Sequence, residues 1–302
     1  MNNLTFYMAA SSIQFPNLHI NIDNLPKGFN IFGVEIAFYG CIIAFGILMG
    51  ILTACLEARH TGQDYNKYID FAIYAIIFSV LGARLYYVAF SWDYYSKHPT
   101  QIFNIRGGGL AIYGGVIAAI ITCFVYTRFK KMSFRLVADT GVLGLLVGQI
   151  IGRWGNFFNR EAFGQVTGDK NPLAMRIYFD DYYSITQVPD VVREGMEKLR
   201  GKALEEIGYI QVQPTFLYES VWNVFVLVMI LIFRKKKKFN GEILLWYLIG
   251  YGLGRAVIEG FRTDQLIMPV TGWPVSQFLS IVLVLAAAGA VAFGRVRVAK
   301  TK

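Results

Sequence analysis

The sequence predicts an all-α, polytopic membrane protein with seven transmembrane helices, and three observations lead to that class. Of the 302 residues, 55% are hydrophobic and only 16% are charged, with a mean hydropathy of +0.44; a soluble globular domain carries about a quarter charged residues. The apolar residues gather into seven stretches, each close to the roughly 20 residues that a membrane-spanning helix needs. Basic residues concentrate in short segments between these stretches, as they do where positive charge sets membrane orientation.

The predicted helices cover residues 35–56, 69–91, 108–127, 134–152, 215–233, 241–260 and 273–294. Ahead of them, residues 1–30 lack the basic start and apolar core of a cleavable signal peptide. The fourth helix is the most polar, with Asp139 and Gln149, but it has a glycine at every third or fourth position from Gly141 to Gly152. These glycines would let a neighbouring helix approach closely.

Three basic segments set the predicted orientation. Residues 128–135, 234–238 and 295–302 follow the third, fifth and seventh helices, so they share one side of the membrane if there are seven helices. The positive-inside rule makes that side cytoplasmic, with the N-terminus outside and the C-terminus cytoplasmic. The stretch 160–212, with charges of both signs and a helical pattern near 191–206, then lies outside. We predict one transmembrane domain over 1–302, with 160–212 as a small extracytoplasmic insertion between helices 4 and 5.

The placement of the basic residues and of the cysteines argues against nucleic-acid binding and against disulfide or metal sites. The net charge of +9 would suit nucleic-acid binding, but no basic soluble domain is present to provide it, so no nucleic-acid partner is expected. The cysteines all lie in apolar stretches, where Cys is usually a small hydrophobic residue. We expect neither a disulfide nor a metal site there, with a catalytic thiol as the alternative. The three cysteines are Cys41, Cys55 and Cys123.

Seven charged side chains lie within or at the ends of the predicted helices, all toward the outer side: Arg84, Arg153, Glu161, Glu219, Arg255, Glu259 and Arg262. A charge near the centre of a membrane helix costs about 3 kcal/mol or more, so such a set points to function. The spacing i, i+4, i+7 of Arg255, Glu259 and Arg262 predicts one charged stripe, with net positive charge to receive an anion. A structural ion-pair network that ties the helices together is the alternative.

The segment GRWGNFFNREAFG, residues 152–164, is a second candidate site. Arg153 and Asn156 share a face if the helix continues, and the glycines would let a ligand approach the backbone. Arginine suits phosphate because its planar fork donates two parallel hydrogen bonds. We interpret the segment as a phosphate headgroup site, with a tight helix-ending turn capped by asparagine as the alternative. An anion transporter would also use intramembrane arginines, but it would usually show an inverted repeat, which is not evident here.

Five ordered motifs span most of the chain: LGARLYYV (81–88), GGGLAIYGG (107–115), GRWGNFFNREAFG (152–164), QPTFLYES (213–220) and GLGRAVIEGFRTDQ (252–265). Together they resemble the motifs of the bacterial prolipoprotein diacylglyceryl transferases. The resemblance implies transfer of the diacylglyceryl group of phosphatidylglycerol to the lipobox cysteine thiol of a prelipoprotein signal peptide. This is the first step of bacterial lipoprotein maturation and releases glycerol phosphate. No metal or cofactor is implied. The expected setting is the bacterial cytoplasmic (inner) membrane, among membrane lipids, with the active site open to the outer leaflet.

The resemblance also assigns residues. Arg153 and Arg255 match the family's two essential arginines, and Tyr39 matches a tyrosine near the substrate cavity. Other functionally important positions are matched by Asn156, Glu161, Gly164, Glu219, Glu259 and Arg262. We therefore predict a catalytic group of Arg153, Arg255, Tyr113 and Glu161, and a substrate-binding group of Tyr39, Arg84, Asn156, Gly164, Glu219, Glu259 and Arg262.

Tyr113 departs from the pattern of the family. Many members carry a histidine at this position, proposed as the base for the thiol. Tyrosine has a pKa of about 10 and is a poor base at pH 7, so we expect Tyr113 to position a substrate or donate a hydrogen bond. Three alternatives stay open for the thiol proton: the tyrosine suffices despite its pKa, another group accepts the proton, or local positive charge favours the thiolate.

Overall fold

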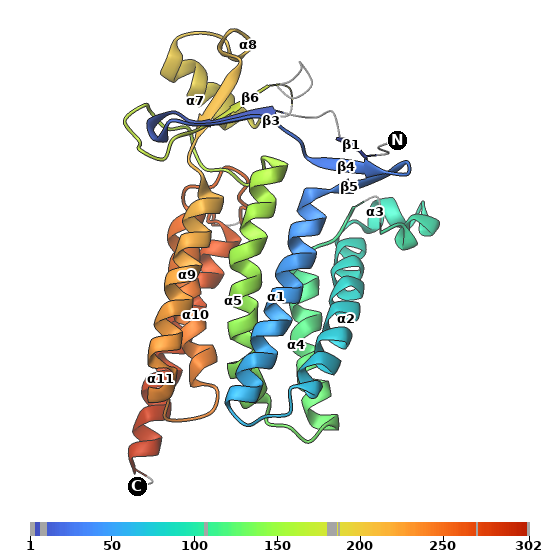
Figure 1. Ribbon diagram of the computed structural model, residues 1–302, viewed down its shortest axis with the longest axis vertical. Coiled ribbons are helices and arrows are strands. Elements are labelled where there is room, and N and C mark those ends of the chain that lie inside the picture. The colour runs from blue at the N-terminus through green and yellow to red at the C-terminus, as the bar shows by residue number, and fades with distance from the viewer. Residues whose placement is uncertain are drawn as a thin grey trace. The chain divides into compact units, whose positions relative to one another are not determined.

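The computed structural model describes residues 4–6, 11–105, 108–179, 186, 188–269 and 271–300 (Figure 1). Arg106 and Gly107, which directly precede the third predicted helix, lie outside the described residues. The chain divides into two compact units: Met1–Gly50 with Leu145–Lys302, and Ile51–Gly144. The chain passes between the units within two long helices, α1 and α5.

Each of the seven predicted membrane segments corresponds to a helix. They are α1 (Phe38–His60), α2 (Asn66–Phe90), α4 (Ile112–Phe129), α5 (Phe134–Asn159), α9 (Thr215–Phe233), α10 (Glu242–Glu259) and α11 (Val275–Lys300). Within the described part of the chain, all of these except α10 are long and apolar enough to cross a membrane. The predicted polytopic class is therefore confirmed with six candidate spans, while the count of seven stays a prediction.

The helix α10 is not among the candidate spans because it contains too many charged residues for its length. It has 18 residues, and Glu242, Arg255 and Glu259 are among them. Glu242 and Glu259 are both buried, with 0% and 2% of their surface exposed. The helix therefore pairs its carboxylates inside the protein and does not present them to lipid, so its role as a seventh span stays a prediction.

In the unit Ile51–Gly144, glycines allow α2 and α4 to pack closely. A Cβ atom on Gly82 would lie 2.7 Å from the carbonyl oxygen of Gly114, closer than real Cβ contacts come. Gly114 belongs to the GGGLAIYGG motif, so part of that motif serves helix packing. The short helices α3 (Trp92–Tyr95) and η2 (Pro99–Phe103) connect the two long ones.

The other unit carries two small antiparallel sheets, which the all-α prediction omitted. One has the order β1–β4–β5, with bounds Leu4–Phe6, Gly28–Ile31 and Val34–Ala37. The other has the order β3–β2–β6–β7, with bounds Ile20–Leu25, Ser11–Phe15, Met175–Tyr178 and Tyr209–Val212. These strands are three to six residues long, too short to give a strong alternating pattern in the sequence. The class is therefore mostly helical and not all-α.

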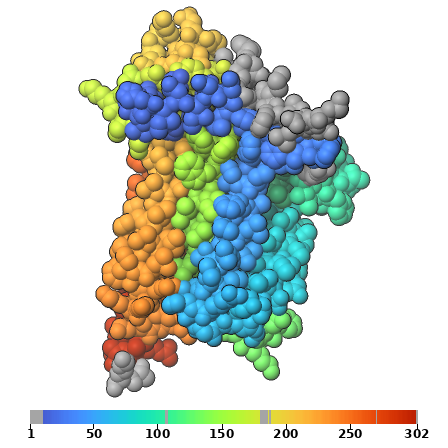
Figure 2. Space-filling model, in the orientation of Figure 1, coloured from blue at the N-terminus to red at the C-terminus, as the bar shows by residue number. Residues whose placement is uncertain are grey.

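The four-stranded sheet unites segments that are distant in the sequence. Ile13 pairs with Ile177, and Ile177 pairs with Ile210, so three buried isoleucines form one row across the sheet. The helix α7 (Asp190–Arg200) adds Val192 and Met196 to the same core. In Figure 2 the N-terminal strands, in blue, lie against the green-to-gold segment that contains β6 and α7. The predicted insertion 160–212 thus shares its core with the N-terminal residues.

The helical pattern near 191–206 is interrupted in the structure. α7 ends at Arg200, and a second short helix, α8, covers Leu204–Ile207. Gly201 adopts φ +68° and its N–H donates to the carbonyl of Glu197. A glycine in the left-handed region is the usual C-terminal signal of a helix, so the break follows from the local sequence.

Candidate active site

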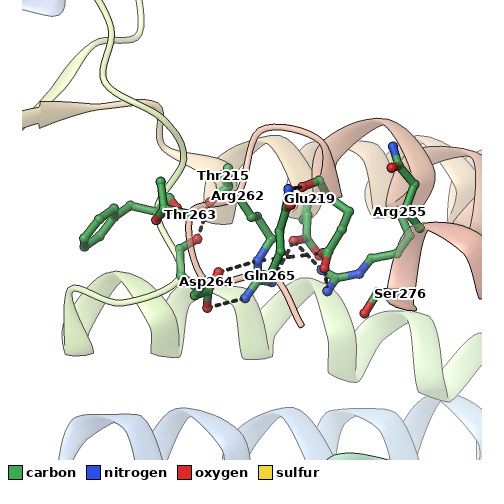
Figure 3. A network of polar contacts seen from close by, with 12 residues as sticks. Thr215, Glu219, Arg255, Arg262, Thr263, Asp264, Gln265 and Ser276 are labelled. Carbon is green, nitrogen blue, oxygen red and sulfur yellow. Dashed lines mark hydrogen bonds and ion pairs between the residues drawn. The ribbon is translucent and has the colours of Figure 1, made fainter. Parts of the chain in front are cut away.

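Glu219 lies at the centre of a buried cluster of arginines (Figure 3). Its Oε2 atom is 2.7 Å from Nη2 of Arg153, and its Oε1 atom is 3.0 Å from Nη1 of Arg255. Nη1 of Arg262 lies 3.6 Å from the same Oε1 atom. These residues come from α9, α5, α10 and the loop that follows α10. One carboxylate, with 4% of its side chain exposed, therefore holds three guanidinium groups together.

The predicted charged stripe is only partly helical. Arg255 and Glu259 do form an i, i+4 pair on α10, with 2.6 Å between Nη2 and Oε2. The helix ends at Glu259, however, and Arg262 lies in the following loop. Asp264 fixes Arg262 there through two contacts, Nε to Oδ1 at 2.9 Å and Nη2 to Oδ2 at 2.8 Å. Burial is the largest single influence on Asp264 and raises its pKa, but the hydrogen bonds from Arg262 and the positive charges of Arg262 and Arg255 together hold the pKa of that carboxyl below its usual value.

Asp264 changes the electrostatic account of the site. The spacing in the sequence suggested net positive charge, but Arg153, Arg255 and Arg262 are balanced by Glu219, Glu259 and Asp264. The carboxylates Glu219 and Glu259 are nearly closed off, with 4% and 3% of their side chains exposed. The side chains of Arg153 and Arg255 are more exposed, at 20% and 15%. Asp264, in contrast, has 47% of its side chain exposed, so the cluster buries two of its three carboxylates.

Arg153 has the largest reserve of hydrogen-bond donors. Across the described ranges of the chain, its only hydrogen-bond or ion-pair partner is Glu219, through Nη2. A guanidinium group has five N–H donors in a fixed plane, which suits the oxygen atoms of a phosphate. Arg153 can therefore keep its contact with Glu219 and bind an anion through Nε and Nη1.

The segment after Arg153 forms a second polar group. The helix α5 continues to Asn159, past its predicted end at 152, so Arg153 and Asn156 do share a helical face. Nδ2 of Asn156 donates to Oε1 of Glu161 at 2.9 Å, and Nδ2 of Asn159 reaches Oε2 at 3.3 Å. Unlike Glu219, Glu161 is held here by neutral amides.

Tyr39 and Gly155 connect α1 to this group. A Cβ atom on Gly155 would lie 3.0 Å from the ring of Tyr39, so the absence of a side chain at Gly155 lets the ring pack closely against α5. The phenol is near enough to Arg153 and Glu161 to interact with both charges. Tyr39 thus lies beside the polar group that follows Arg153, and its place near a substrate cavity stays a prediction.

Gly164 lies where three segments meet. It forms an isolated antiparallel bridge with Arg262, and its N–H donates to the carbonyl of Gln213 at 2.9 Å. A Cβ atom at this position would approach Gln213 Cβ to 2.9 Å and the carbonyl oxygen of Phe261 to 3.1 Å. Gly164 thus lets the loop of Arg262 close onto the start of α9, where Glu219 lies.

Arg84 and Tyr113 belong to the unit Ile51–Gly144. The Arg84 side chain is buried and donates only to backbone carbonyls among the described residues, those of Gln101, Ile102, Asn104, Gly108 and Gly109. It holds the loop that leads into α4. Tyr113 stands in the first turn of α4 and is half-buried.

Asp264 and Asn159 are the contributors that sequence reasoning missed. Both lie inside motifs that were recognised, GLGRAVIEGFRTDQ and GRWGNFFNREAFG, but neither has helical spacing to its partner. Asp264 is two residues from Arg262, and Asn159 is two residues from Glu161. Side chains at i and i+2 do not face each other on a helix, so the helical patterns gave no indication of either contact. Among the described residues, no group of three or more His, Cys, Asp or Glu side chains is arranged to hold a metal ion.

Comparison with known proteins adds independent evidence. Residues 26–293 match the family model described as prolipoprotein diacylglyceryl transferase. The chain belongs to this family. Its relatives include the phosphatidylglycerol–prolipoprotein diacylglyceryl transferase of Clostridioides difficile, 39% identical over 80% of this chain and 84% of that protein. Proteins of the same name from Bacillus licheniformis and Listeria monocytogenes are each 38% identical, with 89% and 90% of this chain and 92% and 90% of theirs covered.

Membership in the transferase family decides between two alternatives that the sequence left open. Both an anion transporter and an enzyme would place arginines within the membrane. The family is one of transferases, so the arginine cluster belongs to an enzyme.

Proposed function

We propose that this protein transfers the diacylglyceryl group of phosphatidylglycerol to the lipobox cysteine of a prelipoprotein signal peptide. The cysteine thiol loses its proton, and its sulfur forms a bond to the glycerol carbon that carries the phosphate. The bond from that carbon to the phosphate oxygen breaks, and the electron pair leaves on glycerol phosphate. Two facts support the proposal: the membership of the chain in the transferase family, and the three guanidinium groups held by Glu219.

Arg153 and Arg255 are the proposed phosphate-binding groups. They are the most exposed arginines of the cluster, and both are held by Glu219. Negative charge grows on the leaving phosphate as the bond from carbon to oxygen breaks. Donors that are already fixed near that position stabilise the transition state more than the ground state. Glu259 and Arg262 would act by positioning Arg255 and Glu219.

Glu161 is the proposed proton acceptor among the carboxylates. Glu219 already compensates guanidinium groups, so taking up a proton there would unbalance the cluster. Glu161 instead accepts hydrogen bonds from the neutral amides of Asn156 and Asn159, so its protonation would not leave an arginine of the cluster uncompensated. Asn156 would fix the direction of its oxygen atoms. Tyr113 would donate a hydrogen bond to a substrate, and Arg84 would position the loop before Tyr113.

The proposed topology has seven spans, with α10 as the sixth in order, the N-terminus outside and the C-terminus cytoplasmic. The basic segments after α4, α9 and within the end of α11 support this orientation. We propose a single transmembrane domain over 1–302, with 160–212 as its extracytoplasmic insertion. The Glu219 cluster would then open to the outer leaflet of the bacterial cytoplasmic membrane.

The reaction is tested directly by mass spectrometry. Purified protein in detergent is incubated with phosphatidylglycerol and a synthetic lipobox peptide, and the expected product carries the mass of one diacylglyceryl group. The product should disappear when the peptide cysteine is replaced by alanine. If the peptide stays unmodified under conditions where a related transferase acts, the proposed reaction is wrong.

A further inference from the structure

An apolar groove of about 850 Å³ runs between α9 and α10. The residues of α9 that line it recur every three or four positions, from Trp222 through Phe225 and Met229 to Phe233. They form one helical face, and several are exposed, including Phe225 at 52%. The groove therefore extends along the helices toward the end opposite Glu219.

The length of the groove matches one leaflet of a bilayer. From Trp222 to Phe233 the helix rises about 16 Å, at about 1.5 Å per residue. The hydrocarbon core of a membrane is about 30 Å thick, so the groove covers about half of it. Both α9 and the basic turn after it belong to one candidate span, Thr215–Lys236. Acyl chains of a single leaflet would lie along the groove without crossing the midplane.

One end of the groove is strongly basic. Lys235, Lys236, Lys238 and Arg295 all line it. Across the described residues, none of the three lysine ammonium groups has an ion-pair partner, although that of Lys236 lies 5.0 Å from the ring centre of Phe233. Arg295 directs Nε to Glu242 at 2.6 Å, but that carboxylate is fully buried and does not line the groove. The accessible charge at this end is positive.

We propose that this groove binds one anionic diacyl phospholipid, with its acyl chains along α9 and α10 and its phosphate on the lysines and Arg295. A zwitterionic lipid would leave the excess positive charge unmatched. A second copy of the chain, related by a twofold axis along the membrane normal, would bring two basic ends together, which like charges oppose. Trp246 lies at the same end, 5.9 Å from Arg295, as tryptophan does at the membrane–water interface.

This binding site is separate from the proposed reaction and goes beyond it. Under the proposed topology the basic end faces the cytoplasm, so the lipid would come from the cytoplasmic leaflet. The Glu219 cluster would act on the outer leaflet. The lipid in the groove would therefore be a bound partner and not the substrate, and variants in the groove should leave turnover unchanged.

Native mass spectrometry of the full chain, titrated with phosphatidylserine or with phosphatidylcholine of the same acyl chains, tests the proposal. We expect one phosphatidylserine to be retained in preference to phosphatidylcholine. Combining Lys235→Gln, Lys236→Gln and Lys238→Gln should weaken that binding at least tenfold, since each lysine near a membrane surface contributes about fivefold. Leu253→Trp, which fills the apolar part without changing charge, should weaken it too. The active-site variant Arg255→Gln should retain the lipid.

The matched control combines Arg128→Gln, Lys131→Gln and Arg135→Gln, which removes the same charge from another segment that we expect to be cytoplasmic. This control should bind phosphatidylserine as the unchanged protein does. Equal retention of both lipids, or equal weakening in the control, would overturn the proposal. So would a dimer that loses the bound lipid as it forms.

Discussion

Replacing Glu219 by glutamine removes one negative charge from the centre of the arginine cluster and leaves the size of the side chain nearly unchanged. Glu219 has 4% of its side chain exposed and lies 2.7 Å from Arg153, 3.0 Å from Arg255 and 3.6 Å from Arg262. Breaking a buried ion pair from one side costs about 3–5 kcal/mol, because the partner charge is left uncompensated. Three guanidinium groups would then share Glu259 and Asp264 alone. We expect Glu219→Gln to lower the thermal midpoint by several degrees.

The same substitution should reduce turnover at least a hundredfold, because Arg153 and Arg255 lose the group that orients both of them. The loss of one preorganised donor costs about 10²–10³ in rate, and here two donors are released together. The assay is the rate of diacylglyceryl transfer to a lipobox peptide, measured at a temperature where the variant is still folded by circular dichroism.

A second buried carboxylate provides the matched control. Glu242 is fully buried and lies 2.6 Å from Arg295, in the same unit of the chain. Glu242→Gln should therefore destabilise the protein in a similar way but leave the rate of transfer within about threefold of the original, since Arg295 binds no substrate phosphate. If both variants lose the same fraction of activity, then Glu219 acts only through stability and the reasoning is refuted.

Three further predictions concern other residues of the chain. Hydrogen bonds from Arg200 and Gln211 hold the pKa of Asp169 in the folded protein below its usual value. The Asp169 carboxylate therefore stabilises the fold at pH values above the unfolded pKa of about 4, and this stabilisation is lost progressively as the pH falls below 4. The difference in thermal midpoint between the original protein and Asp169→Asn should narrow from pH 6 to pH 3. Gly164→Ala forces a Cβ atom to within 2.9 Å of Gln213 and should cost about 1–3 kcal/mol by denaturant unfolding, whereas Gly168→Ala, with open space around it, should have no effect. Arg84→Lys keeps the charge but loses the planar donors, and at about 0.5–1.5 kcal/mol for each lost hydrogen bond it should lower stability nearly as much as Arg84→Gln; a lysine variant as stable as the original would contradict this role.

The helices could be predicted from the sequence because membrane spans are set by length and hydropathy. Six of the seven predicted segments are candidate spans. The prediction was weakest where polar residues extend a helix: α5 runs on through Trp154 and Asn156 to Asn159, and hydropathy alone ends it at 152. The charge balance of the site was also missed, since Asp264 meets Arg262 through a turn.

The sheets could not be predicted for a different reason. Ile13 and Ile177 are adjacent in space but far apart in the chain, and each strand around them has only four or five residues. Such short strands have no local signal strong enough to reveal their partner. The role of Arg84 was hidden in the same way, because its partners are backbone carbonyls and the sequence does not show which carbonyls face inward.

The most direct measurement is the single-turnover rate of diacylglyceryl transfer by Arg153→Gln with saturating phosphatidylglycerol. Arg153 has one hydrogen-bond or ion-pair partner among the described residues and is the most exposed arginine of the cluster, so the substitution should leave the protein folded. Because those donors are proposed to bind the leaving phosphate, the rate should fall at least a hundredfold while the thermal midpoint changes by only a few degrees. A rate within about threefold of the original protein would show that Arg153 does not stabilise the leaving phosphate.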